Sequence, residues 1–249
     1  MSDYMKSLLF AGILCIACSS LLTAAASGLK KIQQENLLTD QRKNILKSVG
    51  LVEQDKEYTS GDINRMFHDS IRRVNIDEKG NLIEENQTAG GDSEKNLPVY
   101  LYQKNGGAVQ AYIIPINTRG LWGEILGYLA IKNDGQTISG FTVYKHSETP
   151  GLGGEIEQNW FQSNFIGKKI TGPSGEFVSI SIAKGKAEDT VGEEKMGNYV
   201  DGISGATLTG KFLSKGLKDV LSGYEPVSII FRKKLQFCKT NPNTPWCKK

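Results

Sequence analysis

The run Asp201-Gly-Ile-Ser-Gly-Ala-Thr-Leu-Thr209 combines small residues with two threonine hydroxyls. Apolar residues recur after it at helical spacing, namely Leu208, Phe212, Leu213, Leu217, Val220 and Leu221. Gly223 is the predicted end of this helix. A helix start offers unpaired backbone N–H groups and a positive dipole end, both of which favour a phosphate. Gly205 and Ala206 would let a phosphate approach the backbone, and a threonine hydroxyl could bind it or be esterified by it.

An ordinary helix cap has the same small and hydroxyl-bearing residues, so local chemistry leaves both interpretations open. The run resembles the flavinylation motif Asp-x-x-Ser/Thr-Gly-Ala-Thr of the FMN-binding domain family, in which the last threonine of the motif carries FMN through a phosphoester bond. The resemblance implies that Thr207 carries FMN, with Thr209 as the competing hydroxyl. It also implies that the neighbours of Thr207 contact the cofactor, namely Ser204, Gly205, Ala206, Leu208 and Thr209.

A second segment with chemical potential is His146-Ser-Glu-Thr-Pro-Gly-Leu-Gly-Gly-Glu155. Its proline and glycines favour a tight loop whose backbone can approach a flat ligand, although a turn followed by a helix cap has the same composition. The segment resembles the His-x-Glu-Thr-Pro-Gly-Leu-Gly stretch that lies beside the flavin in the same family. The resemblance implies cofactor contacts from Glu148, Thr149, Gly151 and Leu152.

Two further groups could act on a bound flavin. A flavin exchanges protons at its ring nitrogens and histidine titrates near neutral pH, so His146 is a candidate proton donor. The alternative is that His146 only orients its loop. In Thr118-Arg-Gly-Leu-Trp-Gly123, Leu121 and Trp122 offer apolar faces for a flat ring, and Arg119 could balance phosphate charge. A core tryptophan and a solvated arginine are the plain alternatives.

The resemblance extends over nearly the whole chain. The phrase from Tyr112 to Gly123, the run Gly151-Leu-Gly-Gly-Glu155 and the segment Gln33-Gln-Glu-Asn36 resemble the family of C subunits of sodium-translocating NADH:quinone reductases. This implies a subunit, inactive alone, that passes electrons from NADH oxidation elsewhere toward ubiquinone or menaquinone, coupled to Na⁺ export. The implied partners are the other subunits, the lipid bilayer and a separate flavin transferase that uses FAD and Mg²⁺; self-attachment is the alternative.

Composition excludes several other classes. The chain has no Gly-x-Gly-x-x-Gly turn, so direct NADH binding is not expected. The net charge of +3 is small and scattered, unlike the basic face of a nucleic-acid binder. With 2 histidines and no cysteine set in the soluble part, no metal site or iron–sulfur cluster is expected. The remaining alternatives are the G subunit of an Rnf ferredoxin:NAD complex, a non-redox membrane-tethered ligand-binding module and an anchored structural protein of an envelope complex.

The N-terminus reads as a membrane anchor. The run from Leu8 to Leu29 has no charged side chain and would span about 33 Å as a helix, enough for a bilayer core. A cleaved signal peptide ending near Ala24-Ala-Ala26 is the alternative. The apolar stripe continues past Lys31 to Val49, which favours one helix that leaves the membrane and carries on.

The distribution of Lys and Arg around the apolar run and the family resemblance predict opposite orientations in the membrane. Lys6 is outnumbered by basic residues after the run, which argues for a cytoplasmic C-terminal domain. The family implies the opposite, an inner-membrane protein with one span and its FMN domain on the extracytoplasmic side. Cys238 and Cys247 flank a short polar tail and could form a disulfide there, or remain thiols.

The pattern of elements predicts an α+β fold with a mainly antiparallel sheet and flanking helices. A helix over 30–50 and a short helix capped by Asp62 and ending at Arg72 are expected, followed by a turn at 77–81 and an exposed loop at 86–96. Strands are expected at 99–103, 108–116, 127–132, 137–146 and 177–183, and a helix at 155–166. The predicted divisions are an anchor (1–30), a connecting region (31–96), an FMN-binding domain (97–225) and a tail (226–249).

Overall fold

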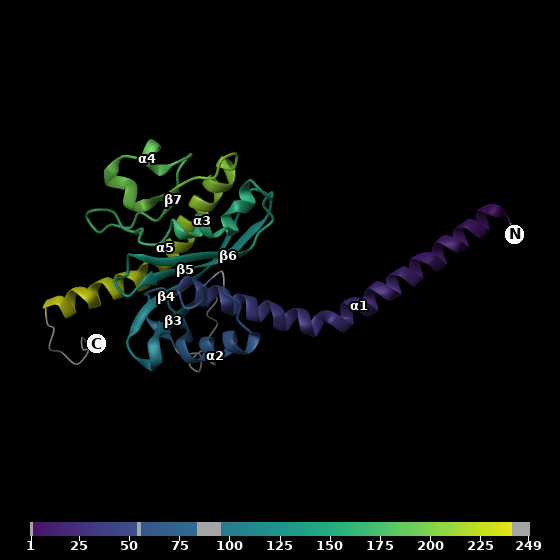
Figure 1. The fold of residues 1–249 in the computed structure, drawn as a ribbon, viewed down its shortest axis with the longest axis horizontal. Helices are drawn as coiled ribbons and strands as arrows, with labels where there is room; N and C mark the ends of the chain where they lie inside the picture. The colour runs from purple at the N-terminus through teal and green to yellow at the C-terminus, as the bar shows by residue number, and fades with distance from the viewer. Residues whose placement is uncertain (1, 54–55, 84–95, 241–249) are drawn as a thin grey trace. The chain divides into compact units, whose positions relative to one another are not determined.

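The computed structural model describes residues 2–53, 56–83 and 96–240 (Figure 1). The chain divides into two compact units, Met1–Gln41 and Arg42–Lys249. From Asp3 onward the first unit is part of one continuous helix, α1 (Asp3–Ser48), so the predicted continuation of the helix beyond the apolar run is confirmed. Among the described residues, α1 alone is long and apolar enough to cross a membrane, a property that N-terminal signal sequences share. The finer divisions at residues 30, 96 and 225 stay predictions.

The second unit is built on a 6-stranded sheet in the order β2-β1-β3-β4-β5-β6. Its strands are β1 (Ile71–Ile76), β2 (Leu82–Ile83), β3 (Leu97–Gln103), β4 (Val109–Arg119), β5 (Glu124–Lys132) and β6 (Ile138–Lys145). Every neighbouring pair is antiparallel. The predicted α+β class with a mainly antiparallel sheet is therefore confirmed, and β3 to β6 are the four strands expected between residues 99 and 146.

The central strands are buried on both faces. On β4, Tyr112 and Ile114 belong to the larger core, whereas Ile113 between them belongs to the smaller core on the other face. On β5, Leu129 and Ala130 divide between the two cores in the same way. Successive side chains of a strand point to opposite faces, so a strand covered on both sides needs a continuous apolar run. The sequence of β4 and β5 supplies that run.

Helices cover both faces of the sheet. The larger core lies against α5 (Thr207–Thr240), with Leu213, Leu217 and Leu221 among its buried residues. The smaller core lies under the end of α1 and α2 (Ser60–Ser70), where Ile45 and Leu46 are almost fully buried. Figure 1 shows α2 and α3 on opposite sides of the sheet. The other elements are η2 (Lys104–Gly106), η3 (Gly153–Glu157), α3 (Asn159–Ser163), the parallel pair β7 (Ser181–Ile182) and β8 (Tyr199–Val200), α4 (Ala187–Thr190) and η4 (Glu193–Asn198).

The predicted end of the last helix at Gly223 is wrong. The helix α5 passes through Gly223 and Pro226 and ends at Thr240. Beyond the proline, Phe231 stacks on Tyr112 with ring centroids 4.7 Å apart, and the Tyr112 hydroxyl donates to Ser228 Oγ at 2.7 Å. Burial raises the pKa of Tyr112, which keeps this hydroxyl a donor. Tertiary packing of this kind outweighs the unfavourable helix propensities of glycine and proline.

Three other predicted elements need correction. Thr59, not Asp62, caps α2, because its side chain accepts from the Asp62 N–H, and the helix ends at Ser70 before β1. The strand at 177–183 shrinks to Ser181–Ile182, because Ser179 has φ of 79°, which breaks the extended backbone. The helix at 155–166 is split into η3 and α3, because Gln158 between them is extended.

The turn at 77–81 is confirmed, since Asp77 accepts from the backbone N–H groups of Lys79 and Asn81 at 2.8 Å each. The expected loop at 86–96 lies, apart from residue 96, outside the described residues. The side chains of Cys238 and Cys247 lie outside them as well, so the disulfide stays a prediction.

Gly216→Ala is expected to lower the free energy of unfolding by about 1–3 kcal/mol. A Cβ at Gly216 would meet the Thr118 side chain on β4, including its Cβ, which the strand backbone holds in place. The matched control is Gly223→Ala on the same helix, where the new Cβ meets Leu97 at an ordinary 3.4 Å and alanine favours the helix. Thermal unfolding of the full chain in detergent, followed by circular dichroism, gives the comparison. Equal effects of the two substitutions would contradict the close packing of α5 on β4.

Candidate functional site

A half-open cleft of about 320 Å³ lies where three segments of the second unit meet. These segments are the turn between β4 and β5, the loop that follows β6, and the start of α5. Because β4 and β6 run in the same direction within the sheet, their ends meet at one edge. The lining residues are Leu121, Trp122, Glu148, Thr149, Leu152, Gly153, Gly205, Ala206, Thr207, Leu208 and Thr209.

Thr207 is the first residue of α5 and is exposed to solvent. The first helical hydrogen bond runs from Gly210 N–H to the Ala206 carbonyl at 3.0 Å. The N–H groups of the three residues between them therefore have no carbonyl partner within the helix. With the positive end of the helix dipole, they create a position that attracts an anionic group.

The chain reaches α5 through a turn that the motif itself stabilises. Gly205 has φ of 74°, which glycine adopts without strain. The Ala206 N–H donates to the Ile203 carbonyl at 3.1 Å. Asp201, the first residue of the motif, accepts from the Ala187 N–H at 2.8 Å and so fixes the start of α4. The same hydrogen bond ties Asp201, six residues before Thr207, to the start of α4.

Glu148 connects the three segments of the cleft. The residue as a whole is 4% exposed. One oxygen, Oε2, accepts from the Thr209 hydroxyl at 2.5 Å, and the other, Oε1, accepts from the Trp122 backbone N–H at 3.0 Å. A Cβ on Gly153 would lie 2.5 Å from Thr209 Oγ1 and 2.7 Å from Glu148 Oε2, so a glycine is required beside this hydrogen bond. The carboxylate forms part of the cleft while its hydrogen bonds stay within the protein.

His146 stabilises the loop after β6. Its Nδ1 accepts from the Glu148 N–H at 3.1 Å, and its Nε2 lies 3.1 Å from Glu157 Oε2. The next turn of the loop is held by the Thr149 carbonyl, which accepts from the N–H groups of Leu152 and Gly154. His146 is not among the described residues that line the cleft. From the sequence, His146 could either donate a proton to the flavin or orient its loop. These contacts fit the second role.

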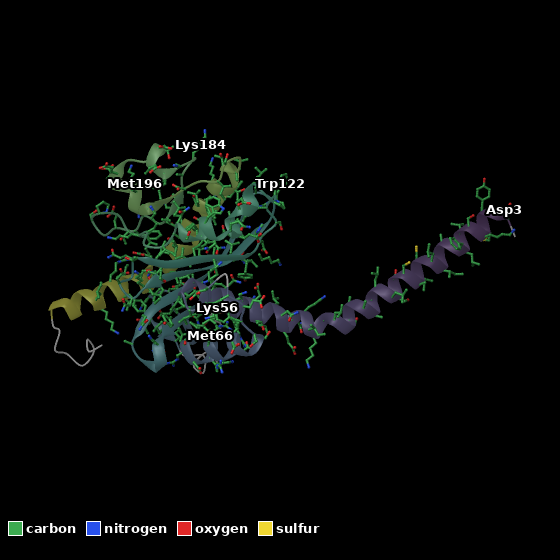
Figure 2. The ribbon with its side chains drawn as sticks, in the orientation of Figure 1. Asp3, Lys56, Met66, Trp122, Lys184 and Met196 are labelled. Carbon is green, nitrogen blue, oxygen red and sulfur yellow. The ribbon has the colours of Figure 1, made fainter. Side chains whose placement is uncertain are left out.

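The walls of the cleft are apolar and meet solvent. Trp122 is 69% exposed, Leu208 53% and Leu152 43%. Figure 2 labels Trp122, which lies at the surface of the domain. Large apolar side chains gathered around one opening are typical of a site for a flat apolar group.

Most of the residues that the sequence singled out come together here. All of the predicted cofactor contacts line the cleft except Ser204 and Gly151. Ser204 lies in the turn before Gly205, and Gly151 has φ of 72°, so it serves the backbone of its loop. Arg119 lies opposite Glu124 in the register of β4 and β5 and is not one of the lining residues. Gly153 lines the cleft although it was not predicted as a cofactor contact. Its position in the glycine-rich run 151–154 is the sequence feature that could have identified it.

A search of protein families matches residues 120–222 to the FMN-binding domain. The chain is 34% identical over 229 residues to the C subunit of the Na(+)-translocating NADH-quinone reductase of Yersinia pestis, covering 82% of this chain and 83% of the relative. It is 30% identical over 242 residues to the protein of the same name from Pseudomonas aeruginosa, covering 87% and 89%. The chain belongs to the C-subunit family of Na⁺-translocating NADH-quinone reductases.

Two solved structures share the fold. The crystal structure of the C subunit from Parabacteroides distasonis has a TM-score of 0.66 and 32% identity, and covers 80% of this chain and 96% of its own. The Shewanella oneidensis NqrC structure, at 21% identity and a TM-score of 0.60, supports the fold alone. The predicted family, fold class and FMN cofactor are confirmed, and the membership makes this chain one subunit of a larger reductase.

The described residues fit FMN. The exposed Thr207 hydroxyl and the unpaired N–H groups beside it suit a phosphate. The apolar walls formed by Trp122, Leu152 and Leu208 suit an isoalloxazine ring. The volume of about 320 Å³ is at the small end of ligand sites, and the open side leaves room for part of the ring to stay outside the cleft.

His146→Leu is expected to lower the free energy of unfolding by about 1–3 kcal/mol, because the Glu148 N–H would lose its acceptor. Glu157→Gln is the control, since Glu157 is 52% exposed and its pair with His146 contributes about 1 kcal/mol or less. Thermal unfolding of the full chain measures both. Unchanged stability of His146→Leu would contradict the orienting role, and a loss of electron transfer in that folded variant would favour proton donation.

Proposed function

We propose that this protein carries FMN covalently on Thr207 and passes electrons from NADH oxidation elsewhere in the reductase toward quinone, coupled to Na⁺ export. The observation that carries the proposal is the contrast between the two threonines of the motif. Thr207 is exposed at the first residue of α5, whereas Thr209 is 2% exposed and hydrogen-bonded to Glu148. Only the first hydroxyl is open to a reagent from outside.

The attachment is a phosphoryl transfer from FAD. The Thr207 Oγ1–P bond forms, the bridging P–O bond of the FAD diphosphate breaks, and AMP leaves. The hydroxyl proton passes to a base of the flavin transferase, which holds Mg²⁺ to offset the charge of the phosphates. The helix start contributes N–H groups that balance the negative charge of the phosphoester that remains.

Once bound, FMN supplies the reversible redox chemistry. The residues that line the cleft would fix its place: Thr207 would hold the phosphate end, and Trp122, Leu152 and Leu208 would cover the ring. No dinucleotide-binding turn occurs in the sequence, so NADH is oxidised at another subunit. This protein is thus an electron carrier that needs partners on both sides.

The proposed location is the bacterial inner membrane, with α1 as an uncleaved single span and the FMN domain outside the cytoplasm. The support is the apolar segment of α1 together with the family. A covalent bond has a clear advantage there, because FMN lost outside the cytoplasm would not be replaced. The count of basic residues after the span argues the other way, so topology needs its own test.

The attachment test uses the full chain coexpressed with its flavin transferase, beside Thr207→Val. The wild type is expected to gain about 438 Da, the mass of FMN less water, and to fluoresce in a denaturing gel. Thr207→Val has nearly the same shape without the hydroxyl and is expected to show neither. A wild type without added mass would refute covalent attachment and favour FMN held without a bond to the chain.

The topology test fuses reporters to the C-terminus of the full chain. Alkaline phosphatase, which needs disulfides, is expected to be active, and green fluorescent protein exported in an unfolded state is expected to be dark. The same fluorescent protein at the N-terminus, before α1, is the control and is expected to be bright. A bright C-terminal fusion with inactive phosphatase would place the domain in the cytoplasm.

A further inference from the structure

We propose that Glu148 is a positioning residue for flavin attachment. Its carboxylate holds Thr209 inward and fixes the first turn of α5, so that Thr207 is the threonine that presents its hydroxyl. The inference rests on the proposed covalent attachment and names the group that directs it. The residues involved are Glu148, Thr209 and Trp122.

The first step is helix geometry. Residues two apart on an α-helix are separated by about 200° around its axis. The structure accordingly buries Thr209, which is 2% exposed, and leaves Thr207 at the surface. A small rotation of the first turn would change which hydroxyl faces the opening, so something must fix that rotation.

The second step is the direction of the hydrogen bond. A carboxylate only accepts, so the Thr209 hydroxyl must be the donor to Glu148 Oε2 at 2.5 Å. Hydrogen bonds to charged groups are stronger than neutral ones, and the carboxylate is itself buried. Because Thr209 is 2% exposed, a reagent could reach its hydroxyl only if the side chain left this position, and that movement would break the bond and leave a buried oxygen without its partner.

The third step is the anchoring of Glu148 itself. Its other oxygen accepts from the Trp122 N–H, and that backbone is held by the bond from Gly120 N–H to the Gly123 carbonyl at 2.7 Å. Glycines at positions 120 and 153 leave space for the carboxylate, because a Cβ at either position would meet it. The carboxylate is therefore fixed to the sheet edge, and α5 is fixed to the carboxylate.

The fourth step is charge. The diphosphate of the flavin donor is anionic and is repelled by a carboxylate beside Thr209. At Thr207 the same diphosphate meets the unpaired N–H groups of the helix start. Electrostatics and exposure thus favour the same hydroxyl, and Glu148 contributes to both.

The test measures the rate at which FMN is attached to the full chain by the purified transferase with FAD and Mg²⁺. Thr209→Val keeps the shape of the side chain and removes the donor, and it is expected to slow attachment at Thr207 about tenfold, as one charge-assisted hydrogen bond allows. Thr209→Ser restores the donor and is expected to return the rate to within about twofold of wild type. Rates are divided by the folded fraction from near-UV circular dichroism, so that partial unfolding is not counted.

A double-mutant cycle completes the test. If Glu148 and Thr209 act through one bond, Glu148→Ala combined with Thr209→Val is expected to be no slower than the slower single variant. Attachment at the wild-type rate in Thr209→Val, failure of Thr209→Ser to rescue, or rate losses that multiply would each overturn the inference. A wild type that carries no flavin, or carries it elsewhere than on Thr207, would instead refute the proposed function.

Discussion

The burial of β4 and β5 on both faces is the constraint on which the rest of the domain depends. A strand with two apolar faces has to be covered twice, and the chain meets this requirement with α5 on one side and the end of α1 with α2 on the other. Neither helix layer can be removed without exposing half of these strands. The sheet therefore fixes where α5 lies, and α5 in turn fixes where its first residue lies.

The cleft follows from this arrangement rather than from any local motif. Strands β4 and β6 end at the same edge, so the turn containing Trp122 and the loop containing Glu148 are neighbours although they are 26 positions apart in the chain. The start of α5 reaches the same edge because the helix packs along β4, with Gly216 against Thr118. Three short segments that lie far apart in the sequence are combined into one site by the sheet behind them.

The elements of the fold that depend on local sequence patterns could be predicted from the sequence. The strand-forming runs and turns of residues 99–146 identify four strands, and the spacing after Thr207 identifies a helix. The errors occur where tertiary contacts override local preference: Phe231 stacking on Tyr112 continues α5 past Gly223, and Ser179 adopts a backbone that no periodicity reveals. The site residues were found through motifs, but the hydrogen bond between Thr209 and Glu148 was not, because it joins residues 61 positions apart.

The position of Thr207 also bears on how electrons could be gated. Thr207 is the first residue of α5, and this long helix packs against the sheet for most of its length. A cofactor bonded there is joined to a rigid helix, so its freedom is limited to rotations of the threonine side chain and of its own ribityl phosphate. A large change in its distance to a redox partner would then require the domain to move as a body.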